Sequence, residues 1–190
     1  MFLRVHALME NSTVNGPGAR AVIWVQGCSL GCPGCWNPQT HAPLQGFRLD
    51  VSEILEWFAK ARRENRIEGL TISGGEPMEQ AQAVLELLRR LKAAHPSITA
   101  GLFSGYTERE LRESLWPAIQ GHLDFAVLGR YNARRRSGDP LVTSANQVLR
   151  LYTARYSMAD FAAQSVEVHI DDTGLTQITG FPILGSPVLG

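Results

Sequence analysis

The chain has 190 residues, with 18 basic and 18 acidic side chains that give a formal net charge of zero. This balance excludes an overall field that would draw the protein to nucleic acid or an anionic membrane, and it favours a small molecule or a protein as substrate. A chain of this length buries roughly 70% of its unfolded surface in one domain, so it needs no metal merely to fold. We predict a single domain over residues 1–190, with its core at 10–152 and an extension over 153–190.

The first predicted elements are a strand and a helix. Residues 20–26 form a β-branched and aromatic run typical of a buried strand, and a cysteine-rich loop follows its end directly. Asp50, with Glu53 three residues later, has the pattern of a capping box. The apolar residues that follow share one helical face: Val51, Ile54, Leu55 and Phe58. These patterns predict a helix that begins after Asp50 and ends near Arg63.

Three more strands follow, separated by helices. We predict the strands over 69–73, 98–103 and 123–128. The segment Gly74-Gly75-Glu76-Pro77 leads into a long helix, because Pro77 suits a first turn. The inward face of that helix is predicted to carry Val84, Leu85, Leu88 and Leu91. A second capping box, Thr107-Glu108-Arg109-Glu110, predicts the start of a third helix.

This alternation of strands and helices predicts an α/β fold with a mostly parallel sheet. Right-handed crossovers place the loops after the strands on one edge, where ligands gather. Residues 131–146 are polar and indicate a long loop, and 147–152 predict a returning strand. Residues 165–170 and 175–179 flank Asp171-Asp172-Thr173-Gly174, which predicts a C-terminal β-hairpin.

All three cysteines, Cys28, Cys32 and Cys35, lie on one glycine-rich loop. Three such thiolates can hold three irons of a cubane cluster and leave the fourth iron open to another ligand. The alternative is a structural zinc site with His41 as fourth ligand, because three cysteines and one histidine are a normal zinc set. Zinc would leave the glycine pair after the next strand unexplained, so the pattern favours the cluster.

The compartment is predicted from the same cysteines and from the apolar runs. Residues 1–10 contain no apolar stretch of signal-peptide length, and runs such as 21–25 are far too short to cross a bilayer. Clustered thiols without a secretory signal are typical of ligands kept reduced. We therefore expect a cytoplasmic protein.

The spacing Cys28-x3-Cys32-x2-Cys35 resembles that of the radical S-adenosylmethionine enzymes, and Gly74-Gly75-Glu76-Pro77 resembles their second motif. The segments 14–20, 26–28 and 35–38 are similar to those of glycyl-radical-enzyme activases, especially the small activases of anaerobic ribonucleotide reductase. The resemblance covers roughly residues 10–152. It implies a partial (β/α) barrel of the radical S-adenosylmethionine type, with the predicted hairpin appended.

The resemblance also implies two cofactors and the residues that bind them. A [4Fe-4S] cluster would be held by the three cysteines, and S-adenosylmethionine would bind its open iron. Gly74 and Gly75 would let backbone carbonyls approach the methionine ammonium, with the Glu76 carboxylate close by. Ser104 would contact the ribose or the carboxylate of the cofactor, although Ser104-Gly105 is also a common turn pair.

Two further residues, Trp36 and Asn146, have implied roles at the cofactor. Trp36 would shield the adenine or the cluster from water, unless it is ordinary core. Asn146 would border the cofactor pocket, unless its segment is only a polar turn. Arg20 is expected to anchor a carboxylate at the base of its strand, and the run Arg134–Arg136 can dock an acidic partner or simply remain solvated.

The function implied is reductive cleavage of S-adenosylmethionine to a 5′-deoxyadenosyl radical, which then abstracts hydrogen from a glycine of a partner enzyme. A low-potential donor such as flavodoxin or ferredoxin would supply the electron. Two alternatives stay open. One is a radical tailoring enzyme acting on a peptide or a small metabolite, since 153–190 match nothing in reductase activases. The other is a zinc or iron–sulfur binding module without turnover.

Overall fold

The computed structural model describes residues 1–139, 141–161, 165–170, 173–174 and 176–181. Its strands are β1 (Phe2–Ser12), β2 (Arg20–Val25), β3 (Phe47–Asp50), β4 (Gly69–Gly74), β5 (Thr99–Ser104), β6 (Phe125–Leu128), β7 (Val148–Leu151), β8 (Val166–Ile170) and β9 (Thr176–Gly180). Its α-helices are α1 (Val51–Asn65), α2 (Ala81–Ala94), α3 (Glu108–Leu111) and α4 (Trp116–Gln120). Short 3-10 turns lie at Pro38–Thr40, Pro77–Gln80, Ala133–Arg135 and Met158–Asp160.

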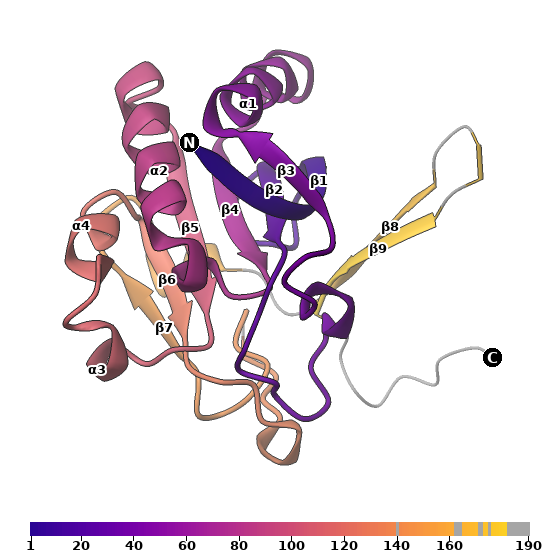
Figure 1. The fold of residues 1–190 in the computed structure, drawn as a ribbon, viewed down its shortest axis with the longest axis vertical. Coiled ribbons are helices and arrows are strands. Elements are labelled where there is room, and N and C mark those ends of the chain that lie inside the picture. The colour runs from indigo at the N-terminus through magenta and orange to yellow at the C-terminus, as the bar shows by residue number, and fades with distance from the viewer. Residues whose placement is uncertain (140, 162–164, 171–172, 175, 182–190) are drawn as a thin grey trace.

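Seven strands form one sheet in the order β3-β1-β2-β4-β5-β6-β7 (Figure 1). The four central strands β2, β4, β5 and β6 pair in parallel, whereas β1, β3 and β7 join antiparallel. The fold is therefore mixed α/β with a parallel centre. The strand pairings of the described residues leave β3 and β7 as edges and do not close the sheet into a barrel.

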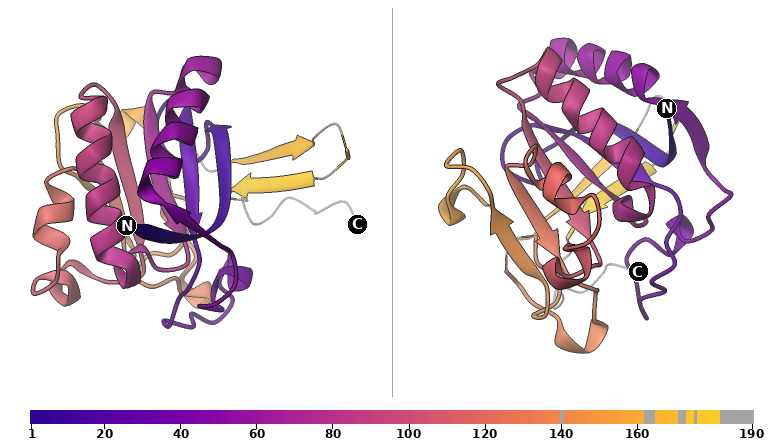
Figure 2. Two further views of the ribbon diagram at one scale, coloured as in Figure 1. Left: turned by 45° about the horizontal axis from the view of Figure 1, so that its top comes forward. Right: turned by 60° about the vertical axis from the view of Figure 1, so that its left-hand side comes forward.

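The helices α1 and α2 pack on one face of the sheet (Figures 1 and 2). The central strands advance in one direction across the sheet, so right-handed crossovers bring their helices to the same side. Alternate residues of each strand then face these helices, as Leu70 and Ile72 of β4 do in the main core. The loops that follow the parallel strands gather at the carboxyl ends of these strands, at the lower edge of the sheet in Figure 1.

The predicted helices are confirmed, with changes at their ends. Asp50 caps α1 by accepting a hydrogen bond of 2.8 Å from the Ser52 backbone N–H, and Glu53 completes the capping box. In α2, Leu87 is fully buried, whereas the predicted Leu85 is only half-buried. The buried face of this helix is centred on Val84, Leu87, Leu88 and Leu91, and Leu85 lies at its border. The helix predicted after Thr107 is a single turn, α3.

The sequence patterns did not predict β1 and β3. The residues of β1 do alternate, since Leu3, Val5 and Met9 are buried and Arg4, His6 and Glu10 are not, but two register shifts disturb its pairing with β2. The strand is fixed by partners on both sides, since β2 and β3 both pair with it. Its place between β2 and β3 therefore depends on long-range pairing, whereas its alternating residues are a local strand signal that sequence analysis missed.

The face of the sheet away from α1 and α2 carries a second core and a buried arginine. Phe125 and Val127 of β6 pack there against Phe161. Arg20 is completely buried, and burial lowers its pKa. Its guanidinium donates to Thr71 Oγ1 at 2.7 Å and to backbone carbonyls, so the partners shown are hydroxyl and carbonyl oxygens and not the carboxylate that was expected.

The C-terminal hairpin of β8 and β9 is confirmed and extends away from the main sheet (Figures 1 and 2). Two polar contacts join it to the end of β1. Glu167 accepts hydrogen bonds from Thr13, and Asn15 Nδ2 donates to Thr179 Oγ1 at 2.9 Å. Of the predicted turn, residues 171–172 lie outside the described part of the chain, as does 175. Within the described part, no helix is long and apolar enough to cross a membrane.

Candidate functional site

The cysteine loop begins where β2 ends and is closed at its base by backbone hydrogen bonds. The Gly27 N–H donates to the Thr40 carbonyl at 2.7 Å, and the Cys28 N–H donates to the His41 carbonyl at 3.2 Å. Ser29 ties the loop to the turn after β4, since its N–H and hydroxyl donate to Glu79 at 2.8 and 2.6 Å. The loop therefore holds its place relative to the neighbouring strand end.

All three cysteines are half-buried free thiols on this loop. Burial raises the pKa of the Cys28 thiol, and the carboxylates of Glu76 and Glu79 raise it further. Burial also raises the pKa of the Cys35 thiol. These thiols would be held as thiolates if they bound iron, because the charge of a metal ion favours the deprotonated form of a coordinating thiol.

Gly74 and Gly75 bring the end of β4 against the end of β2. Gly74 has a φ of +102°, and a Cβ there would lie 2.7 Å from the Val25 nitrogen. A Cβ on Gly75 would collide with the Gly27 carbonyl oxygen. Only glycine allows this close approach, which places the Gly74-Gly75 backbone beside the cysteine loop.

Glu76 follows the two glycines and is completely buried. Its carboxylate accepts hydrogen bonds from the Met78 N–H at 2.9 Å, the Gly105 N–H at 2.7 Å and the Ser104 hydroxyl at 2.8 Å. Burial raises the pKa of Glu76 to about 7, although these three donors act in the opposite direction. The carboxylate thus joins the end of β4 to the end of β5.

A cavity of about 120 Å³ lies where these loops meet. It is lined by all but one of the residues predicted for the site: Cys28, Cys32, Cys35, Trp36, Gly74, Gly75, Glu76 and Ser104. These residues come from the ends of β2, β4 and β5, as the edge of a parallel sheet predicts. The structure therefore brings the cysteines and the predicted cofactor residues together.

Asn146 is the exception, because it lines an adjoining groove of about 580 Å³. Its Nδ2 donates to the Arg130 carbonyl at 2.6 Å, which turns the amide toward the loop after β6. The groove and the cavity share Leu30, Cys32 and Tyr131 in their walls. The predicted residue thus lies in the neighbouring space and not in the cavity itself.

Three buried polar atoms around these two spaces have no hydrogen-bond partner among the residues that the structure describes: His41 Nε2, Tyr131 OH and Asn146 Oδ1. Buried polar groups are normally paired, so unpaired ones at a cavity indicate a polar ligand. Together with three thiols on one wall, they fit a bound iron–sulfur cluster and a polar nucleoside. The residues present are therefore compatible with both implied cofactors.

The zinc alternative adds His41 to the three cysteines as a fourth ligand. Within the described ranges, no three Cys, His, Asp or Glu side chains converge closely enough to hold one metal ion. Two thiolates on a single zinc ion lie within about 4.6 Å of each other, whereas a cubane distributes its thiolates over separate irons. His41 nevertheless lines the cavity with the cysteines.

Trp36 is 40% exposed, which excludes the alternative that it is ordinary core. Its ring centroid lies 5.9 Å from that of Tyr131, and the Arg136 guanidinium lies 6.0 Å from the same indole. The indole therefore bridges the cysteine loop and the loop after β6.

Sequence reasoning missed Thr143 and Gln147, which also line the cavity. Gln147 Oε1 accepts hydrogen bonds from the Thr143 and Ser144 backbone N–H groups, each at 3.1 Å. Their signal was the polar segment 143–147, from which sequence analysis selected only Asn146.

Comparison with known proteins agrees with this site. Residues 14–150 match the family model described as a 4Fe-4S single cluster domain. An anaerobic ribonucleoside-triphosphate reductase-activating protein of Vibrio cholerae is 34% identical over 158 residues, which cover 80% of this chain and 99% of that protein. The protein of the same description from Pasteurella multocida is 29% identical, over 74% of this chain and 92% of its own length.

A pyruvate formate-lyase-activating enzyme of Clostridium pasteurianum is 33% identical over 116 residues, which cover 58% of this chain and 49% of that enzyme. The fold and the cysteine site thus define a 4Fe-4S single cluster domain. The chain belongs to the glycyl-radical-enzyme activases of the radical S-adenosylmethionine type. It is an iron–sulfur enzyme, and the cofactors of its family are a [4Fe-4S] cluster and S-adenosylmethionine.

Proposed function

We propose that this protein cleaves S-adenosylmethionine reductively and uses the resulting radical to generate a glycyl radical on a partner enzyme. The observation that carries the proposal is the meeting of three thiols with the Gly74-Gly75-Glu76 turn in one cavity. The relatives described as activating proteins support the same activity. When bound, the cluster and S-adenosylmethionine together supply methionine and a 5′-deoxyadenosyl radical after transfer of one electron.

The three cysteines would hold the cluster, and the end of β4 would position the cofactor. With both glycines lacking a side chain, backbone groups of the turn are accessible to a ligand ammonium. Glu76 holds Ser104 and Gly105 in place through its hydrogen bonds, so its first role is to fix the shape of the cavity. A Glu76 carboxylate near a bound ammonium would also be favoured in its charged form.

The unpaired polar atoms define where the rest of the cofactor would bind. Tyr131 lines both the cavity and the adjoining groove, so its hydroxyl can exchange hydrogen bonds with a ribose or an adenine bound in the cavity, and Asn146 would border that position from the groove. Trp36 and Tyr131 offer aromatic faces beside them. The cavity is itself open to solvent, so a partner surface would have to complete the enclosure that a reactive radical needs.

A radical tailoring enzyme is the second candidate. The observation that favours it is the C-terminal part, since the family match ends at residue 150 and the β8–β9 hairpin lies beyond it. A hairpin absent from the matched region could serve a different substrate.

The test begins with anaerobic reconstitution of the protein with iron and sulfide. We expect a brown protein that bleaches with dithionite and converts S-adenosylmethionine to 5′-deoxyadenosine. Mixing it with candidate glycyl-radical enzymes should then produce the doublet of a glycyl radical in electron paramagnetic resonance. Cofactor cleavage without a doublet from any partner would favour the tailoring enzyme, and no cleavage at all would contradict both.

A further inference from the structure

The groove of about 580 Å³ opens beside the cysteine loop and has its own chemistry. One wall comes from the cysteine loop, including Cys32, and the other comes from residues 130–134 after β6. The groove touches Cys32 but none of Gly74, Gly75 and Glu76, which line the smaller cavity. It therefore reaches the cluster ligand without passing the predicted cofactor turn.

A run of exposed arginines lies beside this groove, and Arg134 of that run lines it. Residues 125–138 contain four arginines and no acidic residue, and the cysteine loop over 26–46 has no Asp, Glu, Lys or Arg. Arg134, Arg135 and Arg136 are exposed, and no ion pair is found for them among the described residues. Since the whole chain is neutral, this is a local excess of positive charge.

The arginines are presented by a loop that is held in place. The Asn132 N–H donates to Ser144 Oγ at 3.1 Å, and the Ala145 N–H donates to the Arg135 carbonyl at 2.6 Å. Asn132 Oδ1 in turn accepts from the Arg134 N–H at 3.0 Å. Such anchoring lowers the cost of ordering the loop when a partner binds.

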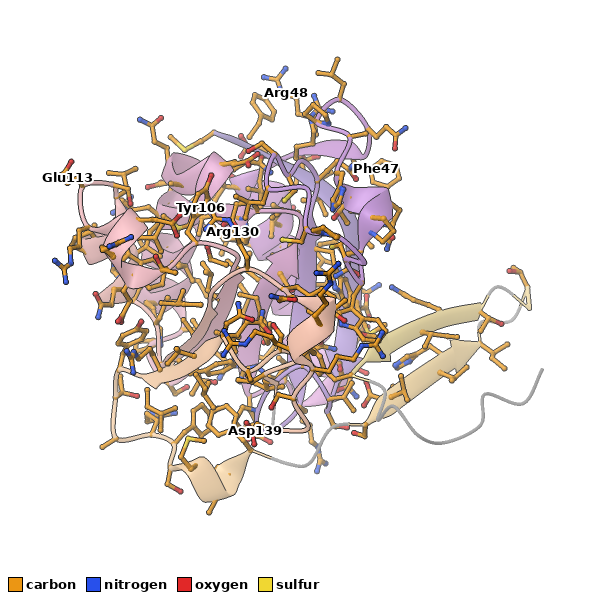
Figure 3. All side chains as sticks on the ribbon, turned by 90° about the horizontal axis from the view of Figure 1, so that it is seen from below. Phe47, Arg48, Tyr106, Glu113, Arg130 and Asp139 are labelled. Atoms are coloured by element: carbon orange, nitrogen blue, oxygen red, sulfur yellow. The ribbon has the colours of Figure 1, made fainter. Side chains whose placement is uncertain are left out.

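A fourth arginine, Arg130, is already paired and borders the same groove. It contacts Glu110 at 2.7 Å and lies 5.4 Å from the Tyr106 ring centroid (Figure 3). Its charge is therefore largely compensated, and the free positive charge comes from the three exposed arginines. A surface of this kind complements an acidic protein.

We propose that this groove, together with Arg134 and Arg135, is the docking surface for an acidic electron-transfer protein that reduces the cluster. The inference rests on the proposed function, which requires one electron for each cleavage. An electron donor needs only a close approach to a cluster ligand, and Cys32 provides it at the wall of the groove. A protein whose glycine is oxidised must instead reach the cavity beside Gly75.

The electron balance of the step is simple. The reduced carrier, a flavin or iron–sulfur protein of low potential, loses one electron and the cluster gains one. No bond forms or breaks at this step. The specificity of the encounter would come from charge, so the rate should depend strongly on ionic strength.

The test measures how fast a reduced acidic flavodoxin bleaches the reconstituted cluster in anaerobic stopped-flow experiments. For the double variant R134E/R135E, we expect the second-order rate constant at low salt to fall at least about tenfold and its decrease with salt to disappear. The neutral pair R134Q/R135Q should give an intermediate loss. The matched control K60E/R63E carries the same charge change on the exposed end of α1, at the opposite edge of the sheet, and should keep the original rate.

Dithionite separates this inference from the proposed function. Dithionite needs no docking surface, so it should reduce the cluster and drive 5′-deoxyadenosine formation equally well in all these variants. If dithionite drives no cleavage in the unsubstituted protein, the proposed function fails, whatever the arginines do. If cleavage occurs but R134E/R135E is reduced by flavodoxin as fast as the control, the docking surface is refuted. Weaker binding of a glycyl-radical enzyme with unchanged reduction would also refute it.

Discussion

The Ser104 hydroxyl donates a hydrogen bond of 2.8 Å to Glu76 Oε1, which links the ends of two neighbouring parallel strands at the site. Both residues are buried, and both line the cavity of the cysteines. Sequence analysis assigned Glu76 and Ser104 separate contacts with the cofactor, whereas the structure joins the two side chains by a hydrogen bond. Its removal should be felt in the shape of the cavity as well as in cofactor binding.

Ser104→Ala removes one of the three donors to the buried Glu76 carboxylate. We expect a stability loss of roughly 1–3 kcal/mol, because a buried acceptor loses a partner. The pKa of Glu76 should rise further, since this hydrogen bond lowers it. Urea unfolding and S-adenosylmethionine binding to the reconstituted protein measure the two effects. Ser97→Ala, on an exposed loop, is the control, and equal behaviour of the two variants would contradict this role of the hydrogen bond between Ser104 and Glu76.

Cys32→Ala should abolish the three-thiolate cluster and all cleavage of S-adenosylmethionine, while the fold remains intact. The reason is that the remaining two thiolates hold only two corners of the cube, whereas the core does not depend on the loop. Iron and sulfide analysis, absorption spectra and 5′-deoxyadenosine yield provide the measurements. Gln39→Ala, an exposed change on the same loop, should retain the cluster. Full turnover by the cysteine variant would refute the assignment.

Gly75→Ala should damage the site by steric means. Its new Cβ would collide with the Gly27 carbonyl oxygen, so the cysteine loop or the turn after β4 must shift. We expect a loss of about 1–3 kcal/mol in the free energy of unfolding, together with weaker cofactor binding. Gly138→Ala is a matched control, because a Cβ there meets nothing within 4 Å. Thermal unfolding that is the same for both variants would disprove the close approach.

His41→Ala distinguishes the cluster from zinc. If the cysteines hold a cluster without His41, the variant should incorporate a full complement of iron and sulfide and no zinc. The imidazole would then affect only the surroundings of the site, where its Nε2 has no hydrogen-bond partner in the described part of the chain. Metal analysis of protein purified without oxygen distinguishes the two sites. Loss of all bound metal would support His41 as a metal ligand.

Acid should remove a contribution to stability that Glu110 makes. The Thr107 backbone and hydroxyl, followed by Arg130, lower the pKa of Glu110 from 4.5 to about 2. The folded state therefore favours the ionised form, and this contribution is present above about pH 4.5 and is lost as the pH falls toward 2. Glu110→Gln should flatten the stability profile in that window, measured by urea unfolding. If the free energy of unfolding of Glu110→Gln falls with acid as steeply as that of the original protein, Glu110 makes no contribution to stability in this pH range.

The sequence by itself determined the features that lie within a few residues of one another. The ligand spacing of Cys28, Cys32 and Cys35 is a property of one short loop, and the capping boxes at Asp50 and Thr107 are equally local. The alternation of strands and helices also predicted the parallel centre of the sheet and the edge at which the candidate site lies. Short-range hydrogen bonding and side-chain periodicity control these features, so a linear pattern records them.

The tertiary structure alone decided which distant residues meet. β1 pairs with β2 on one side and with β3 on the other. Glu76 links two strand ends because Ser104 and Gly105, at the end of β5, donate hydrogen bonds to its carboxylate. The Asn146 amide binds the Arg130 carbonyl, which fixes its place beside the groove. The approach of the arginine loop to Cys32 is of the same kind. Such contacts depend on chain crossings and packing between segments far apart in the sequence, which no local pattern of residues encodes.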